Sequence, residues 1–207
     1  MPVPTFDLDV EKCGCAANCE YGTAKVCYVL NNPNENYPSR KKLLERNWKL
    51  INSPAFVAVM TKQIRQQRIN DFRWFGSGDV FDLESLEKIM QVCKNLPRVR
   101  FWFPTSRDGF LIQFLQKNKI PKNVTLRLSS PKIDHPIPDA MKEYFAPFGV
   151  VFSETTSDPA ESNCSASVDG SNCGDCDHCW NPEHQITKYW IHGKKAQKNL
   201  MQFTERK

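Results

Sequence analysis

Short runs of β-branched and aromatic residues alternate with segments of helical periodicity along most of this sequence. Repeated β-then-α units of this kind imply a parallel sheet with helices packed outside it. We therefore expect an α/β fold, either a closed or partial (β/α)6-type barrel or an open, doubly wound parallel sheet. The runs that predict strands are 5–9, 71–77, 99–104, 124–130, 149–155 and 187–192.

The segments between these runs predict the helices. The first helical region, 39–68, is long and basic, and we expect a break near Ser53 and Pro54 because proline disfavours a helical conformation in the preceding residue. Asp82 is a candidate N-cap for the next helix. The remaining helical segments are 82–96, 109–118 and 137–148.

The expected sheet brings polar side chains to one edge, because both candidate architectures place active sites at the carboxyl ends of the strands. Ser77, Gly78 and Asp79 follow the second strand, and Arg107 follows the third. The fourth strand ends in Ser129 and Ser130, the fifth reaches Glu154, and the sixth ends in His192. A catalytic site at this edge would draw on Asp79, Arg107, Glu154 and His192.

The sequence predicts a cytoplasmic protein. No stretch approaches the roughly 20 apolar residues that a membrane span needs, so we expect no membrane association. The beginning of the chain also lacks the basic region and apolar core of a signal peptide. Cysteines that cluster in a reducing compartment usually bind metal or carry out redox chemistry rather than form disulfides.

Eight of the nine cysteines fall into two clusters. The ninth, Cys93, lies in an apolar helical segment and is expected to be a buried hydrophobic residue. We call residues 13–27 the front cysteine loop and residues 164–179 the back cysteine segment. The front loop contains Cys13, Cys15, Cys19 and Cys27, and the back segment contains Cys164, Cys173, Cys176 and Cys179.

The back cysteine segment contains two successive CxxC steps, with Cys164 as a fourth thiolate across a polar loop. Four thiolates satisfy either tetrahedral zinc or a [4Fe–4S] cluster. Closely spaced CxxC steps are more typical of ferredoxins than of zinc ribbons, so we favour iron–sulfur and keep zinc as the alternative. His178 and His184 could each replace a cysteine, although we expect both to be solvent-exposed loop residues.

The front cysteine loop follows the first strand and offers Cys15, Cys19 and Cys27, with Cys13 as a fourth ligand or a spare. Ligation of a [4Fe–4S] cluster by three cysteines leaves one iron open to a substrate or cofactor. The front loop therefore predicts a catalytic cluster, whereas a fully ligated back cluster would transfer electrons or hold structure.

Several of these features together resemble the bacteriophage family known as gene product 88. They are the early cysteines ending in Cys27-Tyr28, the strand running into Ser77-Gly78-Asp79, and the strand ending in PTSR. The run ending in CDHCW and the late YWIH complete the resemblance, which covers most of the chain. It implies a phage or prophage origin and no particular activity.

The chain is more distantly similar to radical S-adenosylmethionine enzymes, which pair a partial barrel with a three-cysteine loop after the first strand. This resemblance implies one or two [4Fe–4S] clusters and S-adenosylmethionine as cofactors. The cofactor would meet Ser77, Gly78, Asp79 and Ser129, and Arg107 and Glu154 would line the pocket. The spacing departs from the family's CxxxCxxC, because seven residues separate Cys19 from Cys27.

Two other functions stay open. The formal charge of +5 and the basic segments, with Lys41, Lys42, Lys194, Lys195 and Lys198, suit a zinc-stabilised module that binds nucleic acid or a nucleotide. A conventional hydrolase with structural zinc would use the edge residues, but no HExxH, GxSxG or GxxxxGK[ST] pattern supports it.

We divide the chain into three parts. Residues 1–157 form the α/β core with the front cysteine loop. Residues 158–192 form a cysteine-rich metal-binding part that returns a final strand to the core, and residues 193–207 form a basic tail. The resulting hypothesis is an iron–sulfur protein, with a redox or radical activity on a nucleotide, nucleic acid or peptide as its enzymatic form.

Overall fold

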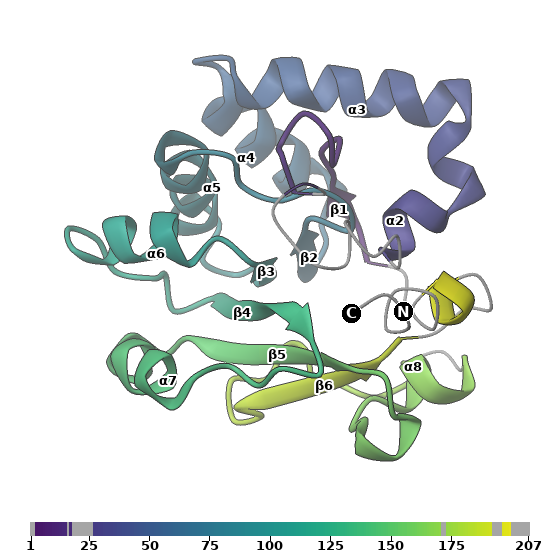
Figure 1. Ribbon diagram of the computed structural model, residues 1–207. Coiled ribbons are helices and arrows are strands. Elements are labelled where there is room, and N and C mark those ends of the chain that lie inside the picture. Colours follow the sequence, from purple (N-terminus) through teal and green to yellow (C-terminus); the bar gives the residue numbers. More distant parts are fainter. Residues whose placement is uncertain (1–2, 16, 18–26, 171–172, 192–195, 200–207) are drawn as a thin grey trace.

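The computed structural model describes residues 3–15, 17, 27–170, 173–191 and 196–199. Its sheet has six parallel strands in the order β1-β2-β3-β4-β5-β6, so each strand pairs with its neighbours in sequence (Figure 1). The α/β prediction is therefore confirmed. The strands are β1 (Thr5–Phe6), β2 (Asp71–Trp74), β3 (Arg100–Thr105), β4 (Val124–Ile133), β5 (Val151–Thr156) and β6 (Ile186–Trp190).

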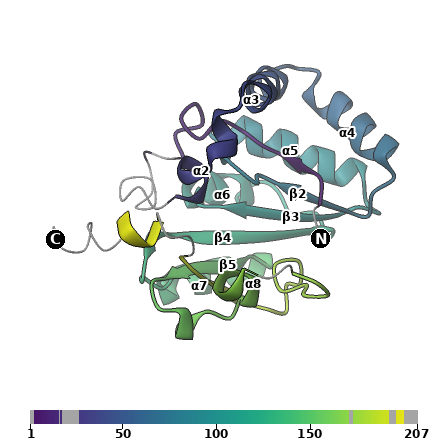
Figure 2. The ribbon, with the colours of Figure 1, turned by 90° about the vertical axis from the view of Figure 1, so that its right-hand side faces the viewer.

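The strand order decides between the expected architectures. A doubly wound sheet reverses its order at a switch point, and this sheet does not. Right-handed crossovers between sequential parallel strands place the longer connecting helices on the same face, and the sheet curves away from these helices (Figures 1 and 2). Since β1 and β6 are not paired with each other in the described sheet, the fold is an open, barrel-like sheet with a concave inner face.

The expected helices form, with short ones added. Residues 39–68 divide as predicted into α3 and α4 around Ser53-Pro54. The sequence did not predict α2 or α8, which are one turn or little more and lack a visible apolar period. The helices are α2 (Tyr28–Asn31), α3 (Pro38–Ile51), α4 (Phe56–Gln67), α5 (Leu83–Asn95), α6 (Asp108–Leu115), α7 (Asp139–Phe145) and α8 (Ser165–Asp169), with 3-10 turns η1 (Pro33–Asn36), η2 (Ala146–Phe148) and η3 (Pro159–Glu161). Residues 196–199 are also helical.

The start of α5 shows how the sequence sets a boundary. Asp82 accepts a hydrogen bond from the Ser85 N–H at 2.7 Å, and Ser85 reaches back to the Asp82 N–H, which completes a capping box. Such a cap contributes about 1 kcal/mol and satisfies amide groups that a helix leaves unpaired. The Asp82 prediction is confirmed.

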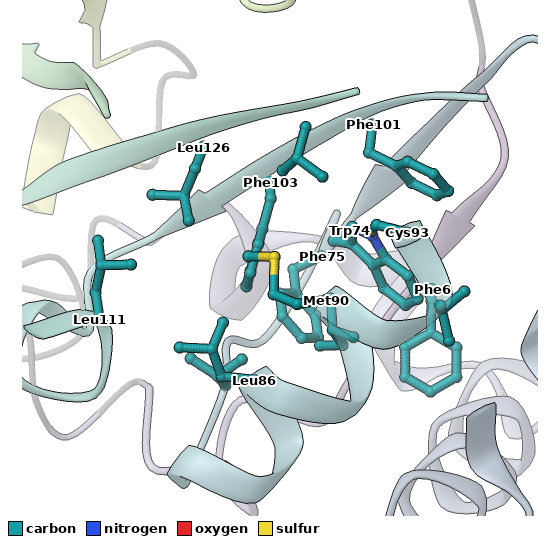
Figure 3. Packing of buried hydrophobic residues seen from close by; sticks show 14 of the residues in the cluster. Phe6, Trp74, Phe75, Leu86, Met90, Cys93, Phe101, Phe103, Leu111 and Leu126 are labelled. Atoms are coloured by element: carbon teal, nitrogen blue, oxygen red, sulfur yellow. The ribbon is translucent and has the colours of Figure 1, made fainter. Parts of the chain in front are cut away.

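The main core lies between the convex face of the sheet and its helices (Figure 3). Trp74 and Phe101 are fully buried and stack with ring centroids 6.1 Å apart. The Trp74 indole N–H donates to Cys93 Sγ at 3.3 Å, so the one polar atom of this ring is satisfied. Cys93 is buried, as predicted, and burial raises the pKa of its thiol far above the ordinary value.

The outer edge of β6 is covered by the chain just before α8. Asn163 donates its N–H to the Lys188 carbonyl at 3.1 Å and accepts the Lys188 N–H at 2.7 Å. Its side-chain amide also donates to Ile186 O. An edge strand whose backbone groups are paired in this way is protected from pairing with another chain.

In the described part of the chain, no helix is both long and apolar enough to cross a membrane.

Candidate functional site

A cavity of about 450 Å³ opens on the concave face of the sheet and extends to the carboxyl ends of the strands. Side chains alternate between the two faces of a strand, so the concave face receives a different set from the apolar core. The residues that line the cavity include Arg73 of β2, Trp102 of β3, Ser129 of β4, Ser153 of β5 and Tyr189 of β6. The cavity is thus bordered by polar as well as apolar side chains, among them Val10, Val29 and Ile191, whereas the convex face is apolar.

The segments after β1 and β2 are fastened together beside this cavity. Asp7 Oδ1 accepts the N–H groups of Gly76 and Ser77 at 2.7 and 3.1 Å. Ser77 Oγ donates to Leu8 O at 3.1 Å, and the Leu8 N–H donates to Ser77 O. We call this set of contacts the β1–β2 latch. Its geometry corrects the expectation that Ser77 reaches a cofactor, because the buried hydroxyl is engaged with Leu8 and Ser77 does not line the cavity.

Gly78 belongs to the latch and also lines the cavity, as the sequence predicts. Its φ of +79° lies in the left-handed region, which favours glycine. A Cβ placed here would lie 2.7 Å from both Leu8 Cβ and Leu8 O. The position therefore requires glycine for conformation and for close approach of the two backbones.

Arg40 of α3 holds the latch from outside. Its guanidinium donates to Asp7 Oδ2 at 2.8 Å and to Ser77 Oγ at 2.9 Å, and its Nε pairs with Glu35. Sequence reasoning missed Arg40 and Asp7. No local pattern connects them, because 33 residues separate the two.

Asp79 lines the cavity but uses its carboxylate to join β2 to β3. It accepts hydrogen bonds from Thr105 Oγ1 at 2.7 Å, from the Ser106 N–H at 2.8 Å and from the Val80 N–H at 2.8 Å. Burial raises the pKa of Asp79, and these hydrogen bonds act against the rise. The arrangement favours a positioning role over the predicted catalytic one.

Arg107 does not line the cavity, which corrects the expectation that it would, and it instead positions the start of the front cysteine loop. Its Nη2 donates to the Cys13 carbonyl at 2.9 Å, which ties the end of β3 to the loop after β1. Cys13 is buried, and a hydrogen bond with the Cys15 side chain lowers the Cys13 pKa although burial opposes this. Cys15 and Cys27 both line the cavity. Cys19 lies outside the described residues.

Glu154 lies away from the cavity, which corrects the expectation that it lines the pocket. Its neighbours Ser153 and Thr155 face the cavity, so alternation turns Glu154 to the opposite face. There its carboxylate accepts the Ile137 N–H at 2.9 Å and lies 4.0 Å from Lys188 Nζ. The other predicted catalytic residue, His192, is outside the described residues.

Hydroxyl groups form the cavity wall on β4 and β5. Ser129 lines the cavity as predicted, and its Oγ lies 2.8 Å from Ser153 Oγ. Sequence reasoning chose Glu154 of this strand as the site residue and not Ser153 or Thr155, although alternation along 151–156 places these two on one face.

The back cysteine segment divides into an exposed and a sheet-bound part. Cys173 and Cys176 are exposed, whereas Cys179 Sγ lies 3.0 Å from Tyr189 Oη. Burial raises the pKa of Cys179, and the nearby Cys164 thiol adds to the rise while Arg127 and Arg73 oppose it. Among the described residues, no three Cys, His, Asp or Glu side chains are grouped so as to hold a metal ion.

Residues 178–184 pack against the concave face beside Thr125 and Arg127 of β4. Arg127 is fully buried and donates to the carbonyls of Phe152, His178 and His184 at 2.7 to 3.3 Å. Thr125 Oγ1 donates to Trp180 O at 2.6 Å. The two histidine rings stack 3.6 Å apart and are half-buried, which corrects the expectation that both are exposed.

Residues 5–206 match the family model described as Gene product 88, which spans nearly the whole chain. No curated protein and no solved structure matches this sequence. The family description states no activity, so the chemistry of the cavity must carry the functional argument.

Proposed function

This chain belongs to the gene product 88 family, and we propose that it is an iron–sulfur protein with a catalytic [4Fe–4S] cluster at the cavity mouth. One observation carries the proposal. Cys15 and Cys27, from the loop after β1, line the same cavity as Gly78 and Asp79 at the end of β2. The two cysteines are far in sequence from Gly78 and Asp79, so the fold, and not a local motif, brings the thiols to the same cavity.

The residues at the mouth suit such a cluster. Thiolates are the ligands that iron–sulfur clusters prefer, and the cluster would be held by Cys15, Cys19 and Cys27. The described thiols of Cys13 and Cys15 are already within hydrogen-bonding reach of one another. The Asp79 carboxylate is held by Thr105 and Ser106.

When bound and reduced by an external electron donor, a cluster with one open iron would supply one-electron chemistry toward S-adenosylmethionine. The residues of the chain have separate tasks. Gly78 leaves the cavity wall free of a side chain, and the Ser129 and Ser153 hydroxyls offer hydrogen bonds to a bound molecule. Arg107 holds the front cysteine loop by its Cys13 carbonyl. A volume of about 450 Å³ lies in the range of small-molecule sites.

Metal analysis after anaerobic purification tests the first part of the proposal. We expect iron and acid-labile sulfide, with the absorption and electron paramagnetic resonance spectra of a [4Fe–4S] cluster. Cys15→Ser and Cys27→Ser should lose the cavity cluster, whereas Cys93→Ala should keep it because Cys93 lies in the apolar core. Stoichiometric zinc without iron would remove the proposal and support the zinc alternative.

Product analysis tests the catalytic part. The reduced protein is incubated with S-adenosylmethionine, and 5′-deoxyadenosine is measured with Cys15→Ser as the blank. An intact cluster that yields no 5′-deoxyadenosine would rule out radical chemistry and leave an electron-transfer or structural role. If 5′-deoxyadenosine does form, repeating the incubation with a nucleotide, a nucleic acid or a peptide would identify the substrate class.

The basic face of α3 favours a second candidate, a nucleic-acid-binding module. Lys41, Lys42 and Arg46 border a shallow surface hollow with Lys49. Glu45 stands among them and pairs with Lys12 and Lys49, which reduces the positive charge. Mobility shift at low salt with single- and double-stranded probes checks this candidate. Unchanged binding in a Lys41→Gln, Lys42→Gln variant would count against α3 as the contact surface.

A further inference from the structure

The concave face holds a group of buried polar atoms without hydrogen-bond partners, and three of them, on Arg73, Trp102 and Arg127, are N–H donors. In the described part of the chain, six buried side-chain nitrogen or oxygen atoms lack a hydrogen-bond partner, and five lie on or against this face. Such groups normally find partners, so a cluster of them indicates that an acceptor occupies the space. The five atoms are Arg73 Nε, Trp102 Nε1, Arg127 Nε, Thr187 Oγ1 and His178 Nδ1.

Positive charge accompanies these donors. Arg73 places its guanidinium 4.2 Å from the centroid of the Trp102 ring, and Arg127 is fully buried. Neither arginine forms an ion pair with a carboxylate among the described residues. Water could accept their hydrogen bonds, but water does not neutralise the buried Arg127 cation or the half-buried Arg73 cation beside it, and unpaired buried charge is costly.

The two cations converge on one place. Arg73 and Arg127 both act electrostatically on Cys179 and on Tyr189, whose Sγ and Oη atoms are in contact. Arg73, Trp102 and Tyr189 also line the cavity described above. The positive region is therefore the part of that cavity lined by Arg73, Trp102 and Tyr189, which we call the cavity floor.

We propose that the cavity floor is an oxyanion subsite that binds a carboxylate or phosphate group of a small molecule. Arg73 Nε and Trp102 Nε1 would donate to the anion, and Arg127 would add charge from beneath. Guanidinium groups match carboxylate and phosphate oxygens in geometry as well as in charge. The rest of the ligand would extend past Ser129 and Ser153 toward Cys15. As a substrate subsite this rests on the proposed function, but anion binding does not.

Anion titration tests the subsite. The protein as purified, with its metal content measured, is titrated with inorganic phosphate, pyrophosphate or malonate at constant ionic strength. Tryptophan fluorescence reports binding, and Trp102→Phe assigns the signal. We expect saturable binding that Arg73→Met weakens at least about ten-fold, with Arg73→Lys in between. Arg98→Met removes the same charge from an exposed position and should leave binding unchanged.

Each outcome of the titration either supports or overturns the anion subsite. Tighter binding of phosphate or pyrophosphate than of malonate identifies a phosphorylated ligand, and the reverse order identifies a carboxylated one. No saturable signal would show that the chain itself supplies the balancing charge and would overturn the proposal, as would equal effects of Arg73→Met and Arg98→Met. Circular dichroism confirms folding of both Arg73 variants. Phosphate binding without a cluster or 5′-deoxyadenosine would reject the proposed function alone, and a working cluster without anion binding would reject only the subsite.

Discussion

Replacing Gly78 by alanine should test whether the β1–β2 latch is as tightly determined as its geometry indicates. Two costs meet at this position. The φ of +79° is unfavourable for a residue with a Cβ, and the new atom would lie 2.7 Å from Leu8 Cβ and Leu8 O. The left-handed conformation costs about 1–2 kcal/mol, and overpacking typically costs about 1–3 kcal/mol. We therefore expect Gly78→Ala to lower the free energy of unfolding by about 2–5 kcal/mol.

Two other glycines separate the two costs, and a third, Gly109, serves as a control. Gly149 has a φ of +70° and open space around its Cβ position, so Gly149→Ala measures the conformational cost alone. Gly76 has no positive φ, but its Cβ would lie 2.9 Å from Asp7 Oδ1, so Gly76→Ala measures the close contact. Gly109 lies in α6 with open space, and Gly109→Ala should stabilise the protein by about 0.5–1 kcal/mol.

Urea denaturation followed by circular dichroism gives the four free energies under one set of conditions. The decisive quantity is the difference between Gly78→Ala and Gly149→Ala, because both share the conformational cost. We expect about 1–3 kcal/mol for that difference, which is the packing cost against Leu8. A Gly78→Ala variant no less stable than Gly149→Ala would refute the reasoning, since the close approach to Leu8 would then cost nothing.

Further predictions concern the back segment, the thiols and pH. Arg127→Met should lower the free energy of unfolding by roughly 3 kcal/mol, because it removes at least two hydrogen bonds of a charged donor at about 1.5 kcal/mol each. The same change should expose residues 178–184 to proteolysis, and an unchanged cleavage rate in that segment would contradict the prediction. In the metal-free protein, Cys173 and Cys176 should react quickly with a thiol reagent and Cys93 only after unfolding, because burial raises the Cys93 pKa and blocks access; mass mapping of labelled peptides decides. Burial raises the folded-state pKa of Asp79 above its ordinary value of 3.8, so the folded state binds more protons between these two pKa values. The free energy of unfolding should therefore fall as pH rises through that window, and Asp79→Asn should remove this slope; parallel slopes in the two proteins would exclude the effect.

Local patterns predicted the elements of the fold well because their causes are local. The break before α4 follows from the Ser53-Pro54 pair, and the start of α5 follows from the Asp82 capping box. The latch could not be predicted in this way. Arg40 and Asp7 meet only because α3 crosses the ends of β1 and β2, and the sequence around either residue contains no pattern that predicts the contact.

The candidate site was predicted in part, and its errors have a common cause. Proximity to a strand end was taken as sufficient for a place at the edge, but side-chain direction also matters. Ser153 and Glu154 are neighbours on β5, so only one of them can face the cavity, and it is Ser153. The apolar face of each strand identifies the side that packs on helices, and that information alone would have excluded Glu154.

The two cysteine groups are positioned by different parts of the fold, which sequence spacing does not reveal. The latch and the Arg107 contact with the Cys13 carbonyl hold the front cysteine loop beside the cavity mouth. Arg127 instead holds the chain around Cys179 against the sheet, and Cys173 and Cys176 stand apart from it in solvent. A metal in the back segment would have to draw these exposed thiols toward a sulfur that the sheet already fixes, whereas Cys15 and Cys27 already border one cavity. Disturbing the latch should therefore affect a front cluster selectively, and disturbing Arg127 should affect a back one.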